Sequence, residues 1–491
     1  MQLVHKHHYR SENDARSRPQ SADKFSLQSK LRSLWPLLLL GFIQLVIYAL
    51  IISLVDLGRN ISVYVSLFLL CFVFYVCSIL FVKKLPSRQP LESKSILLIL
   101  LFAVAFRLIM LPLKPSLSHD MMRFLWDGRL LSHGVNPYLY RPDSAQLDAF
   151  KNVPFFSDYE FKNTFTIYPP LAQLLFAGSY VLYGDNPLGI KAEVVAIDLL
   201  SILVLSILLH KSEVDSRLAS LTLYAWSPLL VVETAGNGHI EPLPIFFLLL
   251  SLILLSNQRY RLSSVAYSFA CWSKLFPILL LPLYLKYVKS SGKRNLREFA
   301  SFYVLSSLLI LLPVFSSSGI NLLSQVFWYS QNITYNSSIS IVVRALLATA
   351  GIGGVPARLS TYIIFLLAFT VILRLKRLRS LPDVADGAIL VLGVFLLVAP
   401  TVLQWYVLWL LPFVALKGFN RNDVGWLYFS GAVVLAYLPQ FSLDYDLNTI
   451  LLLEYLPLYL ILGFLVFFAT KSFSRPLRHW FVTGLCSVAK R

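Results

Sequence analysis

The recurrence of long apolar runs limits the fold more than any other feature of this chain. Segments such as 34–55, 61–82 and 95–113 are long enough to cross a bilayer as helices, and similar runs return along most of the 491 residues. Only 14% of the residues are charged, against about 25% in soluble domains. The strands of an outer-membrane barrel alternate in polarity, which these runs do not. The pattern predicts an all-α polytopic membrane protein and excludes a soluble, secreted disulfide-rich or disordered chain.

The positive charge has an explanation in this topology. The formal net charge is +18, which in a soluble protein suggests a nucleic-acid partner. Here the Lys and Arg residues collect in short loops between apolar runs, as expected for loops on the cytoplasmic side. We therefore expect a lipid bilayer as the partner of the basic loops and no nucleic acid. The four cysteines show neither a metal-binding spacing nor a disulfide framework.

The preference of Lys and Arg for the cytoplasmic side also predicts the domain organisation. Residues 1–33 are expected to form a cytoplasmic basic tail before an uncleaved first span, and 471–491 a second such tail. Residues 34–470 are expected to form one integral membrane domain of about twelve crossings. The long polar segment 114–167 then lies on the outer face, where loops of this length usually serve a function.

Two apolar runs do not fit a simple crossing. A full crossing at 168–183 would place later basic loops outside, so this run is expected to be a short re-entrant helix. The run 262–288 is interrupted by Lys274 and Pro277 and has basic residues at both flanks. It is expected to form two half-helices that start and end inside.

Asp120 is the first candidate for a chemical role. It follows span 95–113 by only seven residues, so it stays close to the membrane surface. A carboxylate at this place can serve as general base toward a hydroxyl. The alternative role is to cap the helix that is expected to begin near Met121, because Asp is a preferred N-cap residue.

The other candidates lie in or beside apolar runs. His239 and Glu241, in the turn 233–241, could bind substrate or a metal, or form an ordinary polar turn. Lys274 within a span costs about 2.5–3.5 kcal/mol on insertion scales, which a carboxylate, carbonyl groups or a phosphate must offset unless the side chain reaches an interface. Arg107 has comparable apolar surroundings.

An aromatic group late in the chain has two interpretations. Gln404, Trp405 and Tyr406 lie between two late spans, on the same expected outer face as the other candidates. Aromatic side chains there are typical of the interfacial belt, and stacking on a sugar ring is the functional alternative. Because the chain has no Walker-A run and no convincing dinucleotide motif, nucleotide-driven chemistry on the inner face is disfavoured.

Several blocks, in chain order, resemble those of a known superfamily over about residues 95–417. The matching residues are Asp120, Phe124, Gly134, Pro137 and Tyr138 in the long loop, then Thr166–Gln173, Trp226–Glu241, Lys274–Pro277 and Gln404–Trp409. This pattern resembles the GT-C glycosyltransferases, and most closely the polyprenyl-phosphate-mannose-dependent mannosyltransferases. One departure is Ser118, which stands where many members carry the first acid of an Asp-x-Asp pair. This departure disfavours a tightly bound divalent metal, and the sequence predicts no other cofactor.

The resemblance implies a function and roles for the candidates. A hexose, with mannose expected, passes with inversion from a polyprenyl-phosphate donor to a hydroxyl of a glycan or glycolipid acceptor on the outer or lumenal face. Asp120 is the catalytic base, and Lys274, His239 and Arg107 are candidates to bind the phosphate. The remaining substrate-binding candidates are Glu241, Tyr168, Gln404, Trp405 and Tyr406.

Two other functions fit many spans with broken helices. A secondary transporter or flippase of lipid-linked sugars is the main alternative, although no internal repeat is visible and the longest polar loop lies outside. An acceptor-binding polymerase or ligase subunit with a lipid diphosphate donor is the second. The expected location is the plasma (inner) membrane of a bacterium or the ER membrane of a eukaryote.

Overall fold

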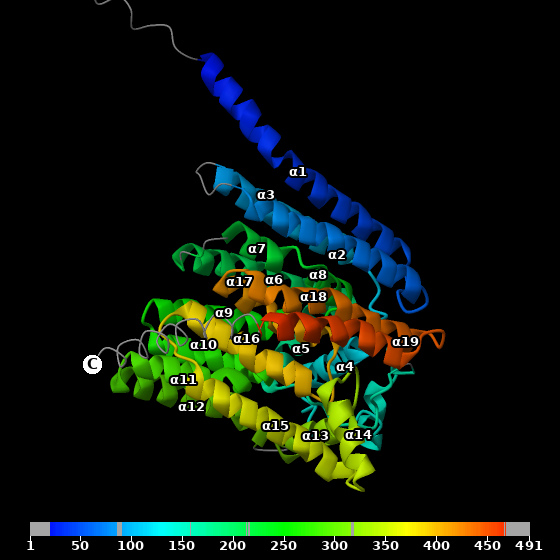
Figure 1. Ribbon diagram of the computed structural model, residues 1–491. Helices are drawn as coiled ribbons and strands as arrows, with labels where there is room; N and C mark the ends of the chain where they lie inside the picture. The colour runs from blue at the N-terminus through cyan, green and yellow to red at the C-terminus, as the bar shows by residue number, and fades with distance from the viewer. Residues whose placement is uncertain are drawn as a thin grey trace, which may run out of the picture.

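The computed structural model describes residues 20–85, 91–157, 159–212, 214, 217–315, 319–465 and 467 (Figure 1). Within these ranges the protein is helical and has no strand, only an isolated bridge between Tyr335 and Thr401. Ten helices in this part of the chain are long and apolar enough to cross a membrane. The protein is therefore an all-α polytopic membrane protein, which confirms the predicted fold class.

The long helices are α1 (Gln20–Ser53), α2 (Ile61–Lys83), α3 (Leu91–Met110), α6 (Pro187–Lys211), α12 (Lys293–Phe315), α15 (Gly354–Leu375), α16 (Leu381–Val398) and an unlabelled last helix (Leu447–Leu465). Shorter elements are α4 (Asp120–Ser132), α5 (Pro170–Tyr183), α9 (Pro242–Ser256), α10 (Tyr260–Ser273), α11 (Leu281–Ser290), α13 (Gly319–Asn332) and α14 (Ile339–Thr349). Two further crossings are composite: α7 (Arg217–Ala225), α8 (Pro228–Val231) and η3 (Val232–Gly236), and η6 (Arg421–Asp423), α18 (Val424–Ala432), η7 (Val433–Ala436) and α19 (Tyr437–Phe441).

The structure differs from the expected twelve crossings at two places. The run 240–256 forms only the 15-residue α9, which begins at Pro242. The run 402–417 divides into η5 (Gln404–Trp409) and α17 (Leu411–Lys417), where Pro412 lacks the N–H that would continue the helix. Both are shorter than a bilayer-crossing helix of about 20 residues.

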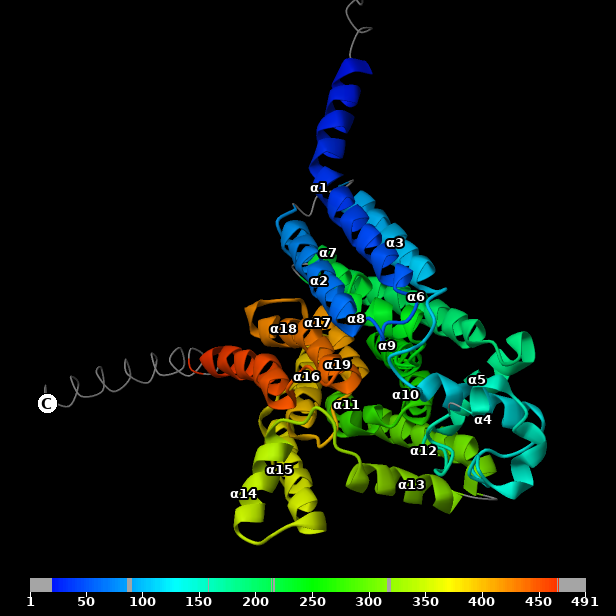
Figure 2. The same cartoon turned by 90° about the vertical axis from the view of Figure 1, so that its right-hand side faces the viewer.

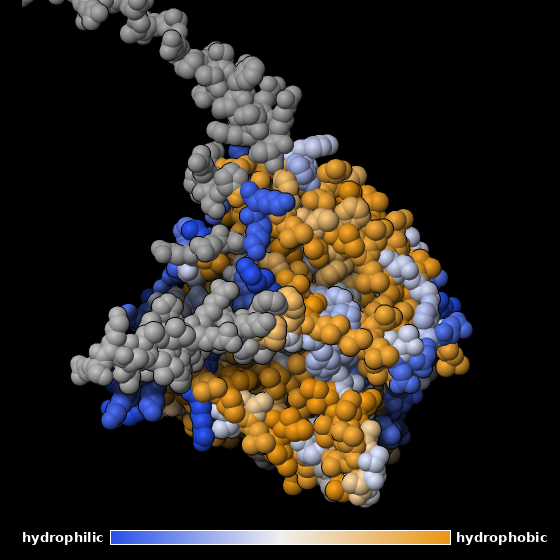
Figure 3. Space-filling view, viewed as in Figure 1, coloured by the Kyte–Doolittle hydropathy of each residue, from blue (hydrophilic) through white to orange (hydrophobic). Residues whose placement is uncertain are grey.

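The expected tails lie largely outside this description. Helix α1 begins at Gln20, so its first turns take in the second part of the expected tail 1–33. Residues 1–19 and the expected tail 471–491 lie outside the described residues. Figure 3 shows hydrophobic residues over the broad middle of the visible face and hydrophilic residues toward its left and right sides, as expected for a bilayer-embedded surface.

The composite crossing 217–236 forms the centre of the bundle. All of its apolar window is buried inside the protein, so it faces protein rather than lipid. Trp226 anchors this segment: its indole N–H donates to the Ile99 carbonyl at 2.9 Å, and its ring lies 5.4 Å from those of Phe102 and Phe106. A helix surrounded by protein can carry polar groups that lipid would exclude.

Helices α4 and α5 pack together beside the bundle (Figure 2). A Cβ at Gly128 would lie 2.3 Å from the Phe176 carbonyl oxygen, so only glycine permits this close approach. Phe124 stacks on Phe176 at 4.5 Å between ring centroids. At 14 residues, α5 is about 21 Å long, short of the roughly 30 Å hydrocarbon core.

The run 262–288 breaks where the sequence predicts. Helix α10 ends at Ser273, Lys274 has extended backbone (φ −158°, ψ 143°), and α11 begins at Leu281 after the short η4 (Phe276–Leu280). The ring of Tyr267 in α10 lies 4.3 Å from that of Tyr284 in α11. The run therefore forms two half-helices that meet at this ring contact, as predicted, while the side of the membrane on which they start and end stays a prediction.

Candidate active site

Asp120 is the first residue of α4, and no side-chain hydrogen bond caps the start of this helix. The backbone N–H of Asp120 donates to Ser118 Oγ at 3.1 Å. Ser118, at the first position of the Asp-x-Asp pattern, therefore helps to fix the start of the helix. The side chain of Asp120 is 23% exposed and lies 3.6 Å from His239 Nδ1. The Tyr168 hydroxyl also interacts with this carboxylate and lowers its pKa. These contacts favour the chemical role of Asp120 over the capping role.

The turn before α9 brings His239 to Asp120. It opens with η3, a single π-helical turn of a kind frequent at functional sites. Gly238 follows with φ +78°, and a Cβ there would lie 2.3 Å from Met121 Cε. Met121 Cε is the flexible end of its side chain and could move aside, but the left-handed backbone at Gly238 strains any other residue, so the turn favours glycine.

His239 is buried between acidic and aromatic partners. Its Nε2 lies 3.4 Å from Glu233 Oε2, and its ring stacks on Trp405 with centroids 3.6 Å apart. Burial, and then the charge of Lys274, lower the pKa of His239 well below its ordinary value. The imidazole is therefore neutral near pH 7. It can accept or donate hydrogen bonds, but it does not supply a positive charge.

Glu233 contacts the His239 imidazole on the side of its Nε2 atom. Its two carboxylate oxygens accept from Asn237 Nδ2 at 3.2 Å and from the Tyr437 hydroxyl at 2.9 Å. The side chain has no exposed surface. A buried carboxylate needs such partners, and they hold the oxygen that faces the imidazole in place.

Lys274 completes the cluster. Its ammonium pairs with the fully buried Glu241 and lies 5.7 Å from the centre of the Tyr406 ring, a cation–π distance. Its side chain is 17% exposed. Burial is the main influence on the pKa of Asp120 and raises it, while the charge of Lys274 acts in the opposite direction. His239, which contacts Asp120, and Glu241, which pairs with Lys274, are two residues apart, so their turn brings Asp120 and Lys274 close together.

An apolar cavity of about 310 Å³ opens beside Lys274, and we call it the Lys274 cavity. Phe276 and Tyr406 each stack on Trp409 with centroids 4.3 Å apart. The other lining residues include Tyr168, Leu279, Val326, Tyr329, Phe395 and Pro400. A cation at the edge of an aromatic and aliphatic cavity suits an anionic head group attached to a hydrocarbon chain.

The remaining residues of the long-loop motif act as supports. Asp127 is buried and accepts from Thr166 Oγ1 at 2.6 Å and from Gln173 Nε2 at 2.8 Å. The Tyr138 hydroxyl donates to the Tyr168 carbonyl at 2.7 Å. These bonds fix the 166–168 segment, so the loop positions Tyr168 against Asp120.

Two of the predicted site residues point elsewhere. Arg107 Nε lies 2.7 Å from Asp198 Oδ2, and neither side chain has exposed surface. Its second nitrogen donates to the Ala225 carbonyl at 2.8 Å, so Arg107 bridges the cores of α3, α6 and α7 instead of facing the Lys274 cavity. Gln404 adjoins Trp405, but its amide donates to the Tyr335 hydroxyl at 2.7 Å.

The sequence interpretation did not single out Lys191. This α6 lysine is 1% exposed, and its ammonium donates to the Leu113 carbonyl. Its Cγ lies 3.1 Å from where a Cβ of Gly238 would be, so it packs behind the His239 turn. The available signal was a single lysine near the start of the apolar run 187–210.

The part of the chain that the structure describes has no grouping of three or more His, Cys, Asp or Glu side chains suited to a metal ion. His239 and Glu241 point to different partners, the imidazole to Asp120 and Glu233 and the carboxylate to Lys274. The arrangement is thus one of carboxylate–imidazole and carboxylate–ammonium pairs.

Comparison with known proteins gives the family. The model of the MptA_B family, described as "Alpha-(1->6)-mannopyranosyltransferase, N-terminal domain", matches residues 44–289. This range holds Asp120, His239, Glu241 and Lys274, and it favours an enzyme over a transporter or flippase. No curated protein matched the chain. Because the match covers half of the sequence, the chain belongs to the MptA_B family of alpha-(1->6)-mannopyranosyltransferases and is an integral membrane glycosyltransferase.

Proposed function

We propose that this protein, a GT-C transferase, moves a mannosyl residue from a polyprenyl-phosphate donor to an acceptor hydroxyl, with inversion at C1. Mannose and an α-(1→6) linkage follow from the family description. An α product formed by a single inversion requires a β-linked donor. The proposal rests chiefly on one observation: Asp120, His239, Glu241 and Lys274 share a site beside an apolar cavity.

The Lys274 cavity supports a lipid phosphate as the donor. The prenyl chain packs against Phe276, Leu279 and Trp409, while the phosphate lies at the ammonium of Lys274. Negative charge develops on the phosphate as its bond to C1 breaks, and a fixed cation in a site with little water stabilises that charge. Glu241 orients the ammonium through their ion pair and offers its second oxygen to the sugar hydroxyls.

Asp120 is proposed as the general base. It takes the proton of the acceptor hydroxyl while that oxygen attacks C1, and the electron pair of the breaking C1–O bond leaves with the phosphate. Burial raises the pKa of Asp120, while Lys274 and the Tyr168 hydroxyl hold it down. A carboxylate of raised pKa is a stronger base, which suits this transfer.

The other predicted residues are proposed to position the reactants. Neutral His239 fixes the Asp120 carboxylate from one side, and Trp405 supports the imidazole by stacking. Tyr168 and Tyr406 line the cavity, where their rings pack on the sugar or on the first prenyl units. The site is proposed to open to the outer face, away from the basic loops.

A reconstitution experiment tests this function. The purified protein in lipid nanodiscs is incubated with polyprenyl-phosphate-[¹⁴C]mannose and a mannoside acceptor. Labelled product and free polyprenyl phosphate are expected, and GDP-[¹⁴C]mannose should give no product. Movement of intact donor across proteoliposome membranes without cleavage would instead support the flippase alternative.

A further inference from the structure

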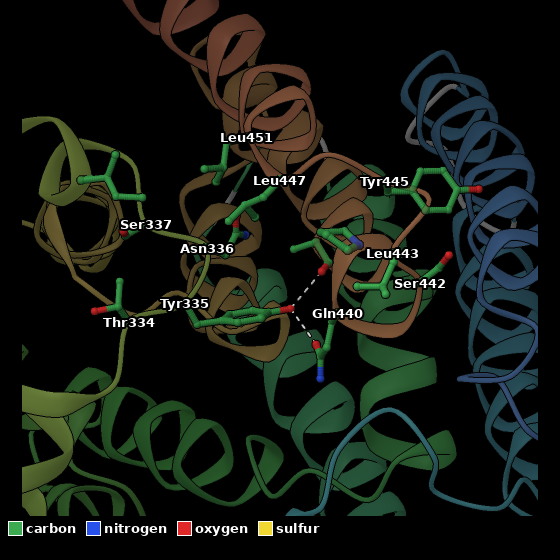
Figure 4. Close-up of a pocket in the computed structure, with 13 residues that line it drawn as sticks. Thr334, Tyr335, Asn336, Ser337, Gln440, Ser442, Leu443, Tyr445, Leu447 and Leu451 are labelled. Atoms are coloured by element: carbon green, nitrogen blue, oxygen red, sulfur yellow. Dashed lines mark hydrogen bonds between the residues drawn. The ribbon is translucent and has the colours of Figure 1, made fainter. Parts of the chain in front are cut away.

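A second cavity, of about 360 Å³, lies among the start of α14, the end of α19 and the loop before the last helix (Figure 4). We call it the Tyr335 cavity. Its lining includes Thr334, Tyr335, Asn336, Ser337, Gln440 and Tyr445. Its volume falls in the range of about 300–1,000 Å³ that is usual for small-molecule sites. The family match ends at residue 289, well before this region.

Hydrogen-bonding groups gather in the Tyr335 cavity. The Tyr335 hydroxyl accepts from Gln404 Nε2 at 2.7 Å and faces the Gln440 Oε1 atom at 2.8 Å and the Ala436 carbonyl at 3.1 Å (Figure 4). Asn336 Oδ1 and Ser337 Oγ are buried without a hydrogen-bond partner among the described residues. Asn336 and Ser337 both line the cavity, so these two atoms leave hydrogen-bonding capacity in its wall.

The charge of this cavity differs from that of the Lys274 cavity. The residues that line it carry hydroxyls, amides and apolar groups, and none of these lining residues is charged. A phosphate or carboxylate ligand would lack a counter-charge there. Neutral hydroxyls and amides beside the rings of Tyr335 and Tyr445 instead suit a saccharide, which presents many hydroxyls and apolar C–H faces.

An apolar hollow of about 480 Å³ continues from the same cavity. It shares Ser337, Ile341 and Leu451 with the Tyr335 cavity and runs between α14 and the last helix. Its walls include Val342 and Leu452, which are 56% and 60% exposed. The last helix is long and apolar enough to cross the membrane. A ligand that fills both spaces is therefore hydroxylated at one end and aliphatic at the other.

One strip of backbone separates the Tyr335 cavity from the Lys274 cavity. The Tyr335 N–H donates to the Pro400 carbonyl at 3.1 Å, and the Val402 N–H donates to the Tyr335 carbonyl at 2.9 Å. Pro400 and Thr401 line the Lys274 cavity on the other side. Gln404, which binds the Tyr335 hydroxyl, precedes the Trp405 that stacks on His239. Tyr335 thus joins the wall of one cavity to the wall of the other.

We propose that the Tyr335 cavity binds the saccharide of a lipid-anchored acceptor, with the lipid chain in the hollow between α14 and the last helix. This inference rests on the proposed function, because the ligand serves as acceptor only if the protein transfers sugar. It places donor and acceptor in separate lipid-accessible spaces, one with a cation and one without.

A cross-linking experiment tests binding independently of turnover. The full-length Asp120→Asn protein in nanodiscs is irradiated with an alkyl α-mannoside that carries a diazirine in its tail, and labelled peptides are identified by mass spectrometry. Labels are expected on residues 339–349 and 447–459, and excess unlabelled alkyl mannoside should remove them. Unsaturable labelling, or labelling confined to α10–α11, would overturn the proposal.

Kinetics on the active protein separate the two ends of the acceptor. Val342→Trp fills the hollow, so the KM for a long-chain alkyl mannoside should rise about tenfold while that for methyl mannoside stays unchanged. Tyr335→Phe removes the hydroxyl between Gln404 and Gln440 and should raise the KM for both acceptors, without changing the KM for the donor. Val371→Trp, at a similarly exposed position on α15, is the matched control and should behave as wild type.

The outcomes distinguish this inference from the proposed function. If the wild-type protein transfers mannose but chain length, Val342→Trp and Tyr335→Phe have no effect, the acceptor site lies elsewhere and only this inference fails. If saturable labelling appears between α14 and the last helix but no acceptor is mannosylated, the proposed function fails. The cavity then binds a glycolipid for another purpose.

Discussion

Two cations embedded in apolar runs, Lys274 and Arg107, have opposite surroundings. Lys274 lies where α10 breaks, keeps 17% of its side chain exposed and pairs with a single carboxylate, Glu241, beside an apolar cavity. Arg107 lies within the unbroken helix α3, has no exposed surface, and binds Asp198 and two backbone carbonyls. One cation faces space for a ligand, and the other is enclosed by the protein and held by three fixed acceptors.

This difference shows how a membrane protein uses buried charge. A guanidinium presents five donors in a rigid fork and can bridge several fixed acceptors, as Arg107 does between α3, α6 and α7. An ammonium at a helix break keeps directions open for another anion. A charge in an apolar run is therefore a candidate for ligand binding only where the backbone also breaks beside a cavity.

The largest expected effect is the loss of the base at the Lys274 site. Asp120→Asn keeps the size of the side chain but cannot take a proton, so the transfer rate should fall about 10²- to 10⁴-fold. Initial rates with labelled donor measure this, while the unfolding midpoint in detergent should stay near wild type. Asp148→Asn, an exposed residue of the same loop, is the control. Wild-type turnover in Asp120→Asn would remove Asp120 from the mechanism.

Loss of the Arg107 side chain should lower the stability of the folded protein. Arg107→Leu leaves Asp198 buried without its partner, which typically costs about 3–5 kcal/mol. The unfolding midpoint, followed by tryptophan fluorescence in detergent, should therefore drop. The double variant Arg107→Leu/Asp198→Leu removes the orphaned charge and should recover much of the loss. If Arg107→Leu kept its stability but lost donor affinity, Arg107 would be a ligand-binding cation after all.

Lys274→Gln should lower activity as well as stability, because it also leaves the buried Glu241 without its partner. Loss of the cation that stabilises the leaving phosphate should lower kcat about 10²- to 10³-fold, by analogy with the removal of one electrostatic donor from an active site. Adding Glu241→Gln removes the unpaired carboxylate and should restore stability but not activity. Lys289→Gln, at an exposed position of α11, is the control. A fall in unfolding midpoint with unchanged kcat would make Lys274 structural.

The smallest expected effect is a shift in pH dependence. Burial raises the pKa of Asp120 and the charge of Lys274 lowers it. The ionised carboxylate is the active form, so kcat/KM should fall as the pH drops through this pKa. Removing the charge in Lys274→Gln lets the pKa rise, and the acidic limb of the residual activity should move to higher pH. A shift to lower pH would contradict the proximity of the two groups.

His239 gives the same profile a second check. Its pKa is well below the ordinary value because of burial and the nearby ammonium, so no limb is expected near pH 6.5. Such a limb in the wild-type protein, lost in His239→Asn, would show that the imidazole titrates during turnover.

The sequence predicted more of the fold than of the site. Apolar runs and basic loops were sufficient for the helical class, and the polar interruption at Lys274 for the helix break. At 402–417 apolarity suggested a crossing, but Pro412 divides the run into η5 and α17. That Asp120 and Lys274 share a pocket was expected from the family resemblance alone, because the order of blocks along the chain gives no distance between them; their catalytic roles stay predictions.

Side-chain directions were not predictable in the same way. Arg107 and Asp198 are 91 residues apart, and nothing in the local sequence of either indicates that they pair. Gln404 was grouped with Trp405 by adjacency, yet consecutive residues of a tight helical turn point in different directions. The Tyr335 cavity draws on two segments about 100 residues apart, and no motif marks either of them.

The sequence by itself determined that this chain inserts into a membrane as helices, because hydrophobic length and loop charge act locally and need no partner. Only the tertiary structure decided which buried charges neutralise each other and which face a cavity. Electrostatic pairing in an apolar interior depends on distances of a few ångströms between helices. Those distances are set by packing across the whole bundle, including glycine contacts such as that of Gly238 with Met121.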